Sequence, residues 1–287
     1  MSVIKNGMNK SLSWFAASLS GCALFLNSLH AAEVPPLRVL LISGGCCHDY
    51  AKQKDILKQG LEQRANLVVT QVYTDDPSTK PPLAILGNPD YAKGYDVVIH
   101  DECAADINDP ALIKAVLAPH RAGIPGVNLH CAIHCYRIGN PGEPATPGSE
   151  RAMWFDYLGL QSSGHGAQMP IAIHFTETNN AIVRGMSDWT TVNEELYNNV
   201  RIRPSVKGLA RGMQTVKNQE GVTRESESVV VWINDYQGTR VFSTTIGHNN
   251  ATVADARYLD LVTRGLLWAC GKLDDQGGIL AGYGPKK

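Results

Sequence analysis

The 287-residue sequence lacks several motifs that would assign a function directly. It contains no G-x-S-x-G, no P-loop and no G-x-G-x-x-G sequence, which mark a serine-hydrolase elbow, a phosphate cradle and a dinucleotide-binding turn. Charged residues make up only 18% of the chain, the formal net charge is −1 and no basic run occurs. The sequence therefore predicts no nucleotide cofactor and no nucleic-acid partner. The 44% of hydrophobic residues is typical of a globular protein with a sizeable core.

The N-terminus also lacks a hydrophobic run long enough to predict a transmembrane helix. Two lysines precede an apolar stretch, residues 12–26, which is too short to span a bilayer with confidence. This order predicts a signal peptide over residues 1–32 and export to the periplasm. Two processing routes remain open. Cleavage near Ala32 would release a soluble chain, whereas lipidation of Cys22 would attach it to a membrane.

Cysteine is present but is not arranged as a disulfide scaffold. Six of the seven cysteines lie beyond residue 32, and a chain of this length does not need such staples. Cys46 and Cys47 are not expected to bridge, because adjacent residues close a strained ring. Cys131 and Cys135 would lie on successive turns of a helix, with their Cβ vectors side by side. We expect mostly buried free thiols, and one longer-range bridge remains open.

Hydrophobic periodicity predicts an α/β fold. Continuous apolar runs alternate with segments of helical spacing, and Asp109-Pro110 is typical of a helix start. The expected strands are residues 37–43, 67–73, 95–100, 124–129, 171–175, 228–234 and 240–247. The expected helices are residues 51–64, a helix from 110, a helix after 129, and residues 149–159 and 255–273. We predict a mostly parallel sheet with helices on both faces, one domain over 33–275 and a loose C-terminal tail over 276–287.

Polar clusters follow three of the expected strands. His48-Asp49 follows the first, Asp101-Glu102 the third, and His130 the fourth. Because ligands of open parallel sheets bind at the carboxyl ends of the strands, we expect these side chains to converge. Each cluster also has a structural alternative, in which Asp49 caps the next helix and Glu102 is a helix-entry charge.

His130 is the most informative residue of the sequence. Residues 125–130 predict a strand that runs into a tight turn, the local shape that exposes one side chain at the top of a sheet. The following helix N-terminus would disfavour protonation of His130, and a neutral imidazole can bind a metal or act as a base. His134 would share its face at i+4. The alternative is a helix start whose histidines bond to the backbone.

The remaining candidates complete a centre for a divalent metal, Zn or Mn. His48, His134 and His248 are expected to join His130 as ligands. The expected catalytic groups besides His130 are Asp49, Glu195 and Tyr197, and the expected substrate-binding groups are His165, Asn249 and Trp154.

Several stretches together resemble the ThuA-like (trehalose utilisation) family. The resemblance covers roughly residues 37–273 and is carried by SGGCCHDY, HDECAAD, GVNLHCAIHCYR, SSGHGAQMP, NEELYN, GTRVFSTTIGHNN and LDLVTRGLLWACGKL. It implies a flavodoxin-like fold of the class I glutamine amidotransferase-like superfamily. Those amidotransferases use a cysteine at the elbow, but here His130 occupies that position and Cys131 is displaced by one residue. Amidotransfer through a cysteine is therefore not expected.

The resemblance also implies a role in carbohydrate utilisation. The leading hypothesis is an exported, metal-dependent hydrolase or lyase that acts on glycosides or 3-keto-glycosides, with a small carbohydrate as its expected partner. The alternative is a non-catalytic carbohydrate-binding or accessory protein, in which Trp154, Trp189 and Tyr197 stack on sugars. A thiol enzyme that uses Cys131 or Cys47 is a third hypothesis. The sequence leaves the oligomeric state open.

Overall fold

The computed structural model describes residues 1–3, 34–217 and 223–286. The contacts of the chain divide it into two units, Met1–Glu33 and Val34–Lys287, and the fold below is that of the second unit. The predicted signal peptide lies almost wholly outside the described residues, and Cys22 lies outside them. Among the described helices, none is long and apolar enough to cross a bilayer.

The second unit is built on one nine-stranded sheet with the order β2-β1-β3-β4-β9-β8-β7-β5-β6. The pairs β1–β2, β1–β3, β3–β4 and β4–β9 are parallel. The pairs β8–β9, β7–β8, β5–β7 and β5–β6 are antiparallel. The strands are β1 (Leu37–Gly45), β2 (Leu67–Thr74), β3 (Val97–Cys103), β4 (Gly126–Leu129), β5 (Leu160–Phe175), β6 (Trp189–Ile202), β7 (Lys207–Lys217), β8 (Thr223–Tyr236) and β9 (Thr239–Thr244).

The prediction of a mostly parallel sheet is therefore wrong, and the sheet is mixed. A parallel pair needs a crossover connection of about a dozen residues or more, most often a helix. The described residues from β5 to β9 contain no α-helix, and strands joined directly by turns run antiparallel. The sequence pattern also missed β6 and β7, and it placed the start of β5 at residue 171 rather than Leu160.

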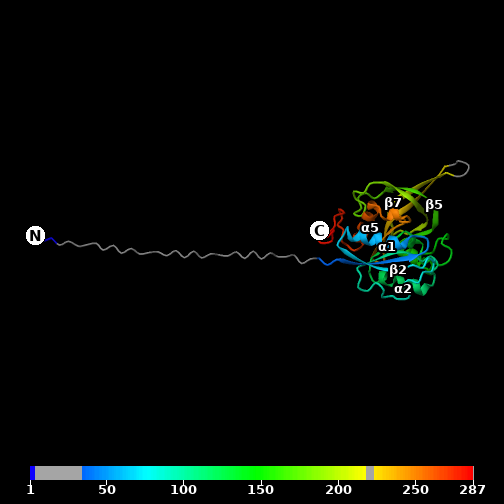
Figure 1. The fold of residues 1–287 in the computed structure, drawn as a ribbon, viewed down its shortest axis with the longest axis horizontal. Helices are drawn as coiled ribbons and strands as arrows, with labels where there is room; N and C mark the ends of the chain where they lie inside the picture. Colours follow the sequence, from blue (N-terminus) through cyan, green and yellow to red (C-terminus); the bar gives the residue numbers. More distant parts are fainter. Residues whose placement is uncertain (4–33, 218–222, 287) are drawn as a thin grey trace. The chain divides into compact units, whose positions relative to one another are not determined.

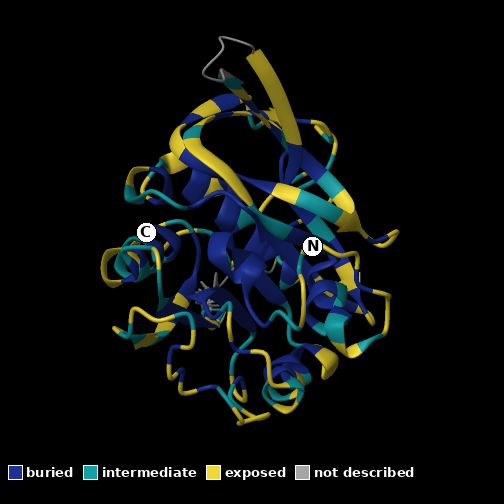
Figure 2. Ribbon diagram, turned by 90° about the vertical axis from the view of Figure 1, so that its right-hand side faces the viewer, coloured by how far each residue is buried: buried dark blue, intermediate teal, exposed yellow. Residues whose placement is uncertain are grey.

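Helices cover both faces of the sheet, as predicted. One face carries α1 (Tyr50–Glu62) and α5 (Ala256–Ala269), which lie together in Figure 1, and the other carries α2 (Pro110–Arg121) and α3 (Met153–Leu158). Successive side chains of a strand point to opposite faces, so β1 contributes Val39 and Leu41 to the first core and Leu40 and Ile42 to the second. In Figure 2 buried segments gather at the centre of the second unit, and exposed segments lie in the outer loops and along parts of the outer strands. The short elements are the 3₁₀ helices η1 (His130–His134) and η2 (Glu150–Ala152), and α4 (Asn250–Val253).

The C-terminal segment packs against the domain and is not the loose tail that the sequence suggested. The backbone N–H of Asn66 donates to the carbonyl oxygen of Tyr283 (2.9 Å). The side chain of Asn66 donates to the carbonyl oxygen of Gly282 (2.8 Å), and Leu273 pairs with Ile279 in an isolated bridge.

A buried polar network crosses the core between β3 and α2. Glu102 Oε1 lies 2.8 Å from His100 Nδ1 and accepts a hydrogen bond from the hydroxyl of Tyr136 (2.7 Å). His100 Nε2 lies 3.0 Å from His120 Nε2, and His120 Nδ1 donates to the carbonyl oxygen of Ile124 (2.8 Å). Glu102, His100 and His120 are fully buried. The structure thus turns Glu102 into the core, so it is neither a metal ligand nor a helix-entry charge.

This network predicts a loss of stability in acid. Burial, together with the charge of His100, lowers the pKa of His120 from 6.5 to about 3. The unfolded chain therefore binds a proton below about pH 6.5 while folded His120 stays neutral, so the stabilisation is present above that pH and falls as the pH approaches 3. In the wild-type protein, this effect should lower the free energy of unfolding by about 3 kcal/mol between pH 6.5 and about pH 4. The His120→Gln variant should not show this decrease. Urea unfolding at both pH values measures this difference, and parallel curves for the two proteins would refute it.

Candidate metal and catalytic centre

His130 occupies the tight turn that the sequence predicts at the end of β4. Its φ is +43°, a left-handed conformation that is uncommon for a residue with a side chain. Gly247 lies opposite with φ +134°, which side chains rarely adopt, and a Cβ on it would meet the Tyr258 hydroxyl at 2.9 Å, so this position requires glycine. His130 Nδ1 donates to the carbonyl oxygen of Thr245 (2.6 Å). This bond fixes the tautomer and leaves the lone pair of the neutral ring on Nε2.

Two further imidazoles converge on His130. His48 follows β1, and His248 follows β9. The ring centroid of His48 lies 4.6 Å from that of His130 and 4.8 Å from that of His248. Each of the three rings also offers a nitrogen atom, and these three atoms lie within 4.8 Å of one another. The three predicted ligands from separate strand ends are therefore brought together.

Glu195, on β6, supplies the carboxylate of the centre. Its Oε2 lies 3.4 Å from His130 Nε2, and its Oε1 lies 3.3 Å from His248 Nδ1. On its outer side, His165 Nε2 lies 3.6 Å from Oε2, and the amide of Gln168 donates to Oε1 (3.0 Å). The carboxylate is 5% exposed, so it faces these partners rather than bulk water.

The charges of the centre are strongly coupled. Burial alone would raise the pKa of Glu195, but the hydrogen bond and charge of His130 with the charges of His165 and His248 lower it to about 2. Burial likewise opposes protonation of His130, but the bond to Glu195 and the charge of Glu194 raise its pKa. The helix N-terminus was expected to disfavour protonation of His130, but the net effect of its surroundings is to raise this pKa. A 3₁₀ helix of five residues has a weak dipole, and the carboxylates outweigh it.

His48 differs from His130 in its electrostatics. Burial is the main cause that lowers its pKa to about 2, and the charges of His130 and His248 lower it further. His48 is therefore neutral at physiological pH, with a lone pair available on its ring.

His134 does not join the three imidazoles. Its Nε2 forms a 2.8 Å hydrogen bond with Ser162 Oγ, and its ring stacks on Tyr197 with centroids 3.9 Å apart. Residues 130–134 form a 3₁₀ helix rather than an α-helix. With about three residues per turn, positions i and i+4 lie on different faces, so the spacing that predicted a shared face does not apply.

The predicted aromatic residues are buried. Tyr197 is 1% exposed, and its hydroxyl lies 3.4 Å from His130 Nε2, so it lies at the centre as predicted. Trp154 is 1% exposed and donates to the carbonyl oxygen of Ala132 (2.8 Å). Trp189 is 8% exposed and is covered by Arg257. None of the three offers a free face on which a sugar could stack.

A surface hollow of about 530 Å³ leads to the centre. It is lined by Cys47, His48, Asp49, His248, Asn249 and Asn250. Asn249 Oδ1 accepts from the backbone N–H of Ala251 and caps α4. Asp49 accepts from Lys52 (2.8 Å) and Asn250 (2.9 Å). Asp49 thus lies on the wall of the hollow with its Oδ2 already accepting two hydrogen bonds, whereas His165 is half-exposed beside Glu195.

Comparison with known proteins identifies the family of this chain and other structures that share its fold. The sequence model of the trehalose utilisation (ThuA) family matches residues 38–269. The chain belongs to the ThuA family. A ThuA-like protein from Parabacteroides merdae is 21% identical, with a TM-score of 0.58 over 82% of this chain and 90% of that one. A ThuA-like protein from Bacteroides uniformis is 15% identical, with a TM-score of 0.57 over 88% and 98%. These structures share the fold, and no curated protein sequence matches.

Two cysteines of this ThuA chain depart from the sequence prediction. Cys46 and Cys47 form a disulfide, so the expectation that they remain unbridged is wrong. Gly44 and Gly45 have φ of +130° and +100°, and Cys47 has φ +80°. This left-handed turn brings adjacent side chains to the same side, which an ordinary strand would not. Four of the other cysteines are free thiols, as expected: Cys103, Cys131, Cys135 and Cys270.

Glu194 is a residue of the centre that the sequence analysis missed. It is fully buried, and its carboxylate accepts from the backbone N–H groups of Gly247 (3.3 Å), His248 (2.9 Å) and Asn249 (3.0 Å). It therefore holds the loop that presents His248. The adjacent pair Glu194-Glu195 was the available signal, but only the loop geometry separates the anchor from the carboxylate of the centre.

Replacement of Glu194 by alanine should displace His248. One buried and two partly buried N–H groups would lose their acceptor, and since the loss for a buried group costs about 1–3 kcal/mol, we expect a destabilisation of about 3 kcal/mol. We also expect weaker metal binding, because His248 is no longer held. Thermal unfolding and metal titration measure the two effects. The exposed Glu225, replaced in the same way, is the control; equal behaviour of the two variants would contradict the anchoring role.

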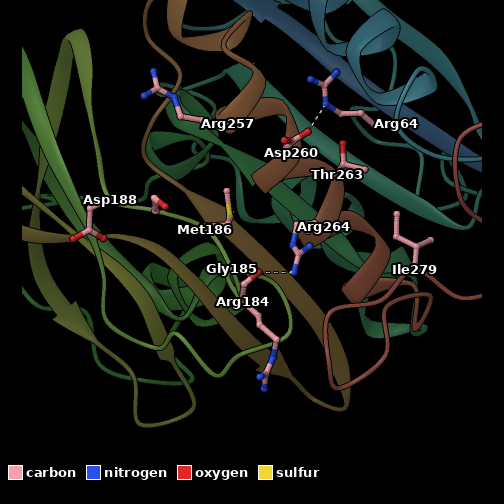
Figure 3. A pocket seen from close by; sticks show the side chains of 11 residues that line it. Arg64, Arg184, Gly185, Met186, Asp188, Arg257, Asp260, Thr263, Arg264 and Ile279 are labelled. Atoms are coloured by element: carbon pink, nitrogen blue, oxygen red, sulfur yellow. Dashed lines mark hydrogen bonds and ion pairs between the residues drawn. The ribbon is translucent and has the colours of Figure 1, made fainter.

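A second depression, of about 600 Å³, is lined by Arg64, Arg184, Arg257 and Arg264 but does not form an anion site (Figure 3). Arg64 pairs with Asp260 (2.7 Å), and Arg257 pairs with Asp255 (2.6 Å). Arg264 donates to the carbonyl oxygens of Ile182, Ala181 and Arg184. The guanidinium groups are therefore largely satisfied within the protein.

The residues of the imidazole centre fit a divalent metal. His48 Nδ1 is buried without a hydrogen-bond partner, an arrangement that costs free energy unless a ligand satisfies it. His248 Nδ1 faces the Glu195 carboxylate at 3.3 Å. His130 presents Nε2 while its other ring N–H binds a backbone carbonyl, the usual outer-shell arrangement of a metal-bound histidine. Three imidazoles beside a carboxylate suit Zn²⁺ or Mn²⁺.

Proposed function

We propose that this ThuA-family chain is a metal-dependent enzyme that cleaves 3-keto-glycosides by elimination or hydrolysis. The observation that carries the proposal is the convergence of three imidazoles and the Glu195 carboxylate, in which His48 Nδ1 is buried without a partner and His48 and His248 line a surface hollow. Imidazoles that only serve as polar surface groups have no reason to cluster in this way. A cation bound between them would have its charge offset by the buried Glu195 carboxylate.

His48, His130 and His248 would hold the ion, and Glu195 would complete its ligands or balance its charge. A divalent ion bound there supplies a Lewis acid that polarises a carbonyl oxygen. Burial raises the pKa of Tyr197 well above its usual value, so its hydroxyl stays protonated and can donate to an oxyanion.

His165 is suited to accept a proton at the mouth of the centre. Its Nδ1 donates to the carbonyl oxygen of Gly166 (2.9 Å), which leaves the lone pair of the neutral ring on Nε2, the nitrogen nearest Glu195. The side chain is 39% exposed, so a bound substrate can reach it.

The substrate class follows from the chemistry of an oxidised sugar. A ketone at C3 acidifies the proton on C2, so a base can take that proton while the bond from C1 to the leaving oxygen breaks. The leaving oxygen takes up a proton, and water can then add to the unsaturated sugar. The family description, trehalose utilisation, supports a carbohydrate as the substrate.

We also propose that the chain works after export to the periplasm. The Cys46–Cys47 disulfide supports this location, because disulfides persist in oxidising compartments. Cleavage near Ala32 and lipidation of Cys22 both remain compatible with it.

The test combines metal analysis with turnover. Untagged protein is analysed by inductively coupled plasma mass spectrometry and incubated with 3-keto-glycosides, before and after chelator treatment. We expect about one equivalent of Zn or Mn, product formation from the keto substrate, and loss of turnover with the chelator. Binding of sugars without metal and without product would instead support the carbohydrate-binding alternative and reject the enzyme.

A further inference from the structure

Four sulfur atoms gather beside the imidazole centre, and the proposed function uses none of them. Cys46 and Cys47, after β1, are joined by a disulfide. Cys103, at the end of β3, has its Sγ 3.4 Å from Cys46 Sγ, and Cys131, in η1, has its Sγ 2.9 Å from Cys103 Sγ. Three chain segments far apart in sequence thus place four sulfurs in a row, in which Cys103 Sγ contacts both Cys46 Sγ and Cys131 Sγ.

The spacing of these sulfurs is that of a metal–thiolate cluster. The Sγ atoms of Cys46, Cys47 and Cys103 all lie within 4.8 Å of one another. With Zn–S bonds of about 2.3 Å, the sulfurs of a tetrahedral site are roughly 3.8 Å apart. In the oxidised protein Cys46 and Cys47 are bonded to each other, so they cannot act as thiolate ligands.

The surroundings allow both reduction and ion binding. Cys47 is exposed and Cys46 is half-buried, so an external thiol can reach the disulfide. Cys103 and Cys131 are buried and pack with Tyr50. The hydroxyl of Tyr50 is also buried, and it has no hydrogen-bond partner. It is a donor that can satisfy a thiolate ligand from the outer shell.

We propose that Cys46, Cys47 and Cys103 form a second, redox-gated site for a thiophilic ion, Zn²⁺ or Cu⁺. A dithiol reductant makes the ligands available: its two electrons and two protons pass to Cys46 and Cys47, and the reductant becomes a disulfide. The ion then binds these three sulfurs, beside the Cys131 thiol that contacts Cys103, and the thiols that coordinate the ion release their protons. The imidazole centre needs no reduction, so the two sites respond to different conditions.

Cobalt(II) is the probe that separates the two sites, because sulfur ligation gives a charge-transfer absorption in the near ultraviolet and imidazole ligation does not. Oxidised full-length protein is titrated with Co²⁺, and so is protein reduced with a phosphine and desalted without oxygen. We expect the reduced protein to bind one additional equivalent, with the sulfur band present only in that sample and lost on addition of Zn²⁺. Absence of the band after reduction would overturn the proposal, whatever the imidazole centre binds.

Single serine substitutions test the ligands. Cys46→Ser and Cys103→Ser should each weaken the additional cobalt binding at least tenfold in the reduced protein. Cys270→Ser, which removes a free thiol outside the cluster, should keep it. If Cys103→Ser destabilises the buried end of β3, the half-buried Cys46 still gives the answer. Unchanged binding in Cys46→Ser, or equal loss in Cys270→Ser, would reject these residues as the site.

Discussion

Replacement of His130 by alanine should remove the bound metal and nearly all turnover. His130 is the most buried of the three imidazoles, at 2% exposed, and it alone is fixed by a bond to a backbone carbonyl. Mutation of an outer-shell partner typically costs roughly 10–100-fold in metal affinity or activity, and loss of a ligand should exceed that. Metal content by mass spectrometry and kcat/KM on a 3-keto-glycoside measure the two losses.

The stability of the His130→Ala variant should change little, which separates function from folding. Glu195 would keep His165, His248 and Gln168 as partners, so its carboxylate is not left alone. His174→Ala is the matched control, since His174 is exposed and pairs only with Asp188. If His130→Ala retained its metal and full turnover, the imidazole centre would not be the active site.

The sequence predicted the centre where local geometry decides it. His48, His130 and His248 each follow a strand at the same edge of the sheet, so parallel topology alone brings them together. The prediction that His134 is a ligand was wrong because its position depends on whether the turn after β4 is α-helical or 3₁₀. The spacing of the histidines does not determine which of the two forms. The prediction that Trp154 binds substrate was wrong for a different reason, because an aromatic residue that could stack on a ligand fits equally well into a core.

The fold was predictable in the first half of the domain, where strands and helices alternate along the sequence. β1, β3, β4 and α2 have uniform apolar runs or a clear N-cap, whereas β6 carries Glu194 and Glu195 at buried positions and shows no clean alternation. The buried functional carboxylates thus interrupt the alternating pattern by which a strand is recognised in a sequence. The Cys46–Cys47 disulfide was missed because it depends on three backbone conformations with positive φ within four residues, at Gly44, Gly45 and Cys47.

Glu102 should be among the most costly side chains to remove, although it lies outside the centre. His120 Nδ1 donates to a carbonyl, so in the neutral ring Nε2 accepts, and it does so from His100 Nε2–H. His100 Nδ1 then faces Glu102 Oε1 at 2.8 Å, and two acceptors at that distance require one proton between them. Glu102 and His100 therefore share a proton in a fully buried setting, with the Tyr136 hydroxyl as a second donor.

Glu102→Ala would leave His100 and Tyr136 without their partner and would open a cavity. We expect a destabilisation of about 3–5 kcal/mol, which lowers the melting temperature by roughly 10 °C. Glu102→Gln should cost less, because an amide NH2 in the position of Oε1 has two N–H groups, one to donate to His100 Nδ1 and one to donate to the Tyr136 hydroxyl oxygen. Glu150→Ala, which breaks the exposed pair with Lys114, should stay within about 0.5 kcal/mol. Equal melting temperatures for the Glu102→Ala and Glu150→Ala variants would mean that the shared proton does not stabilise the core.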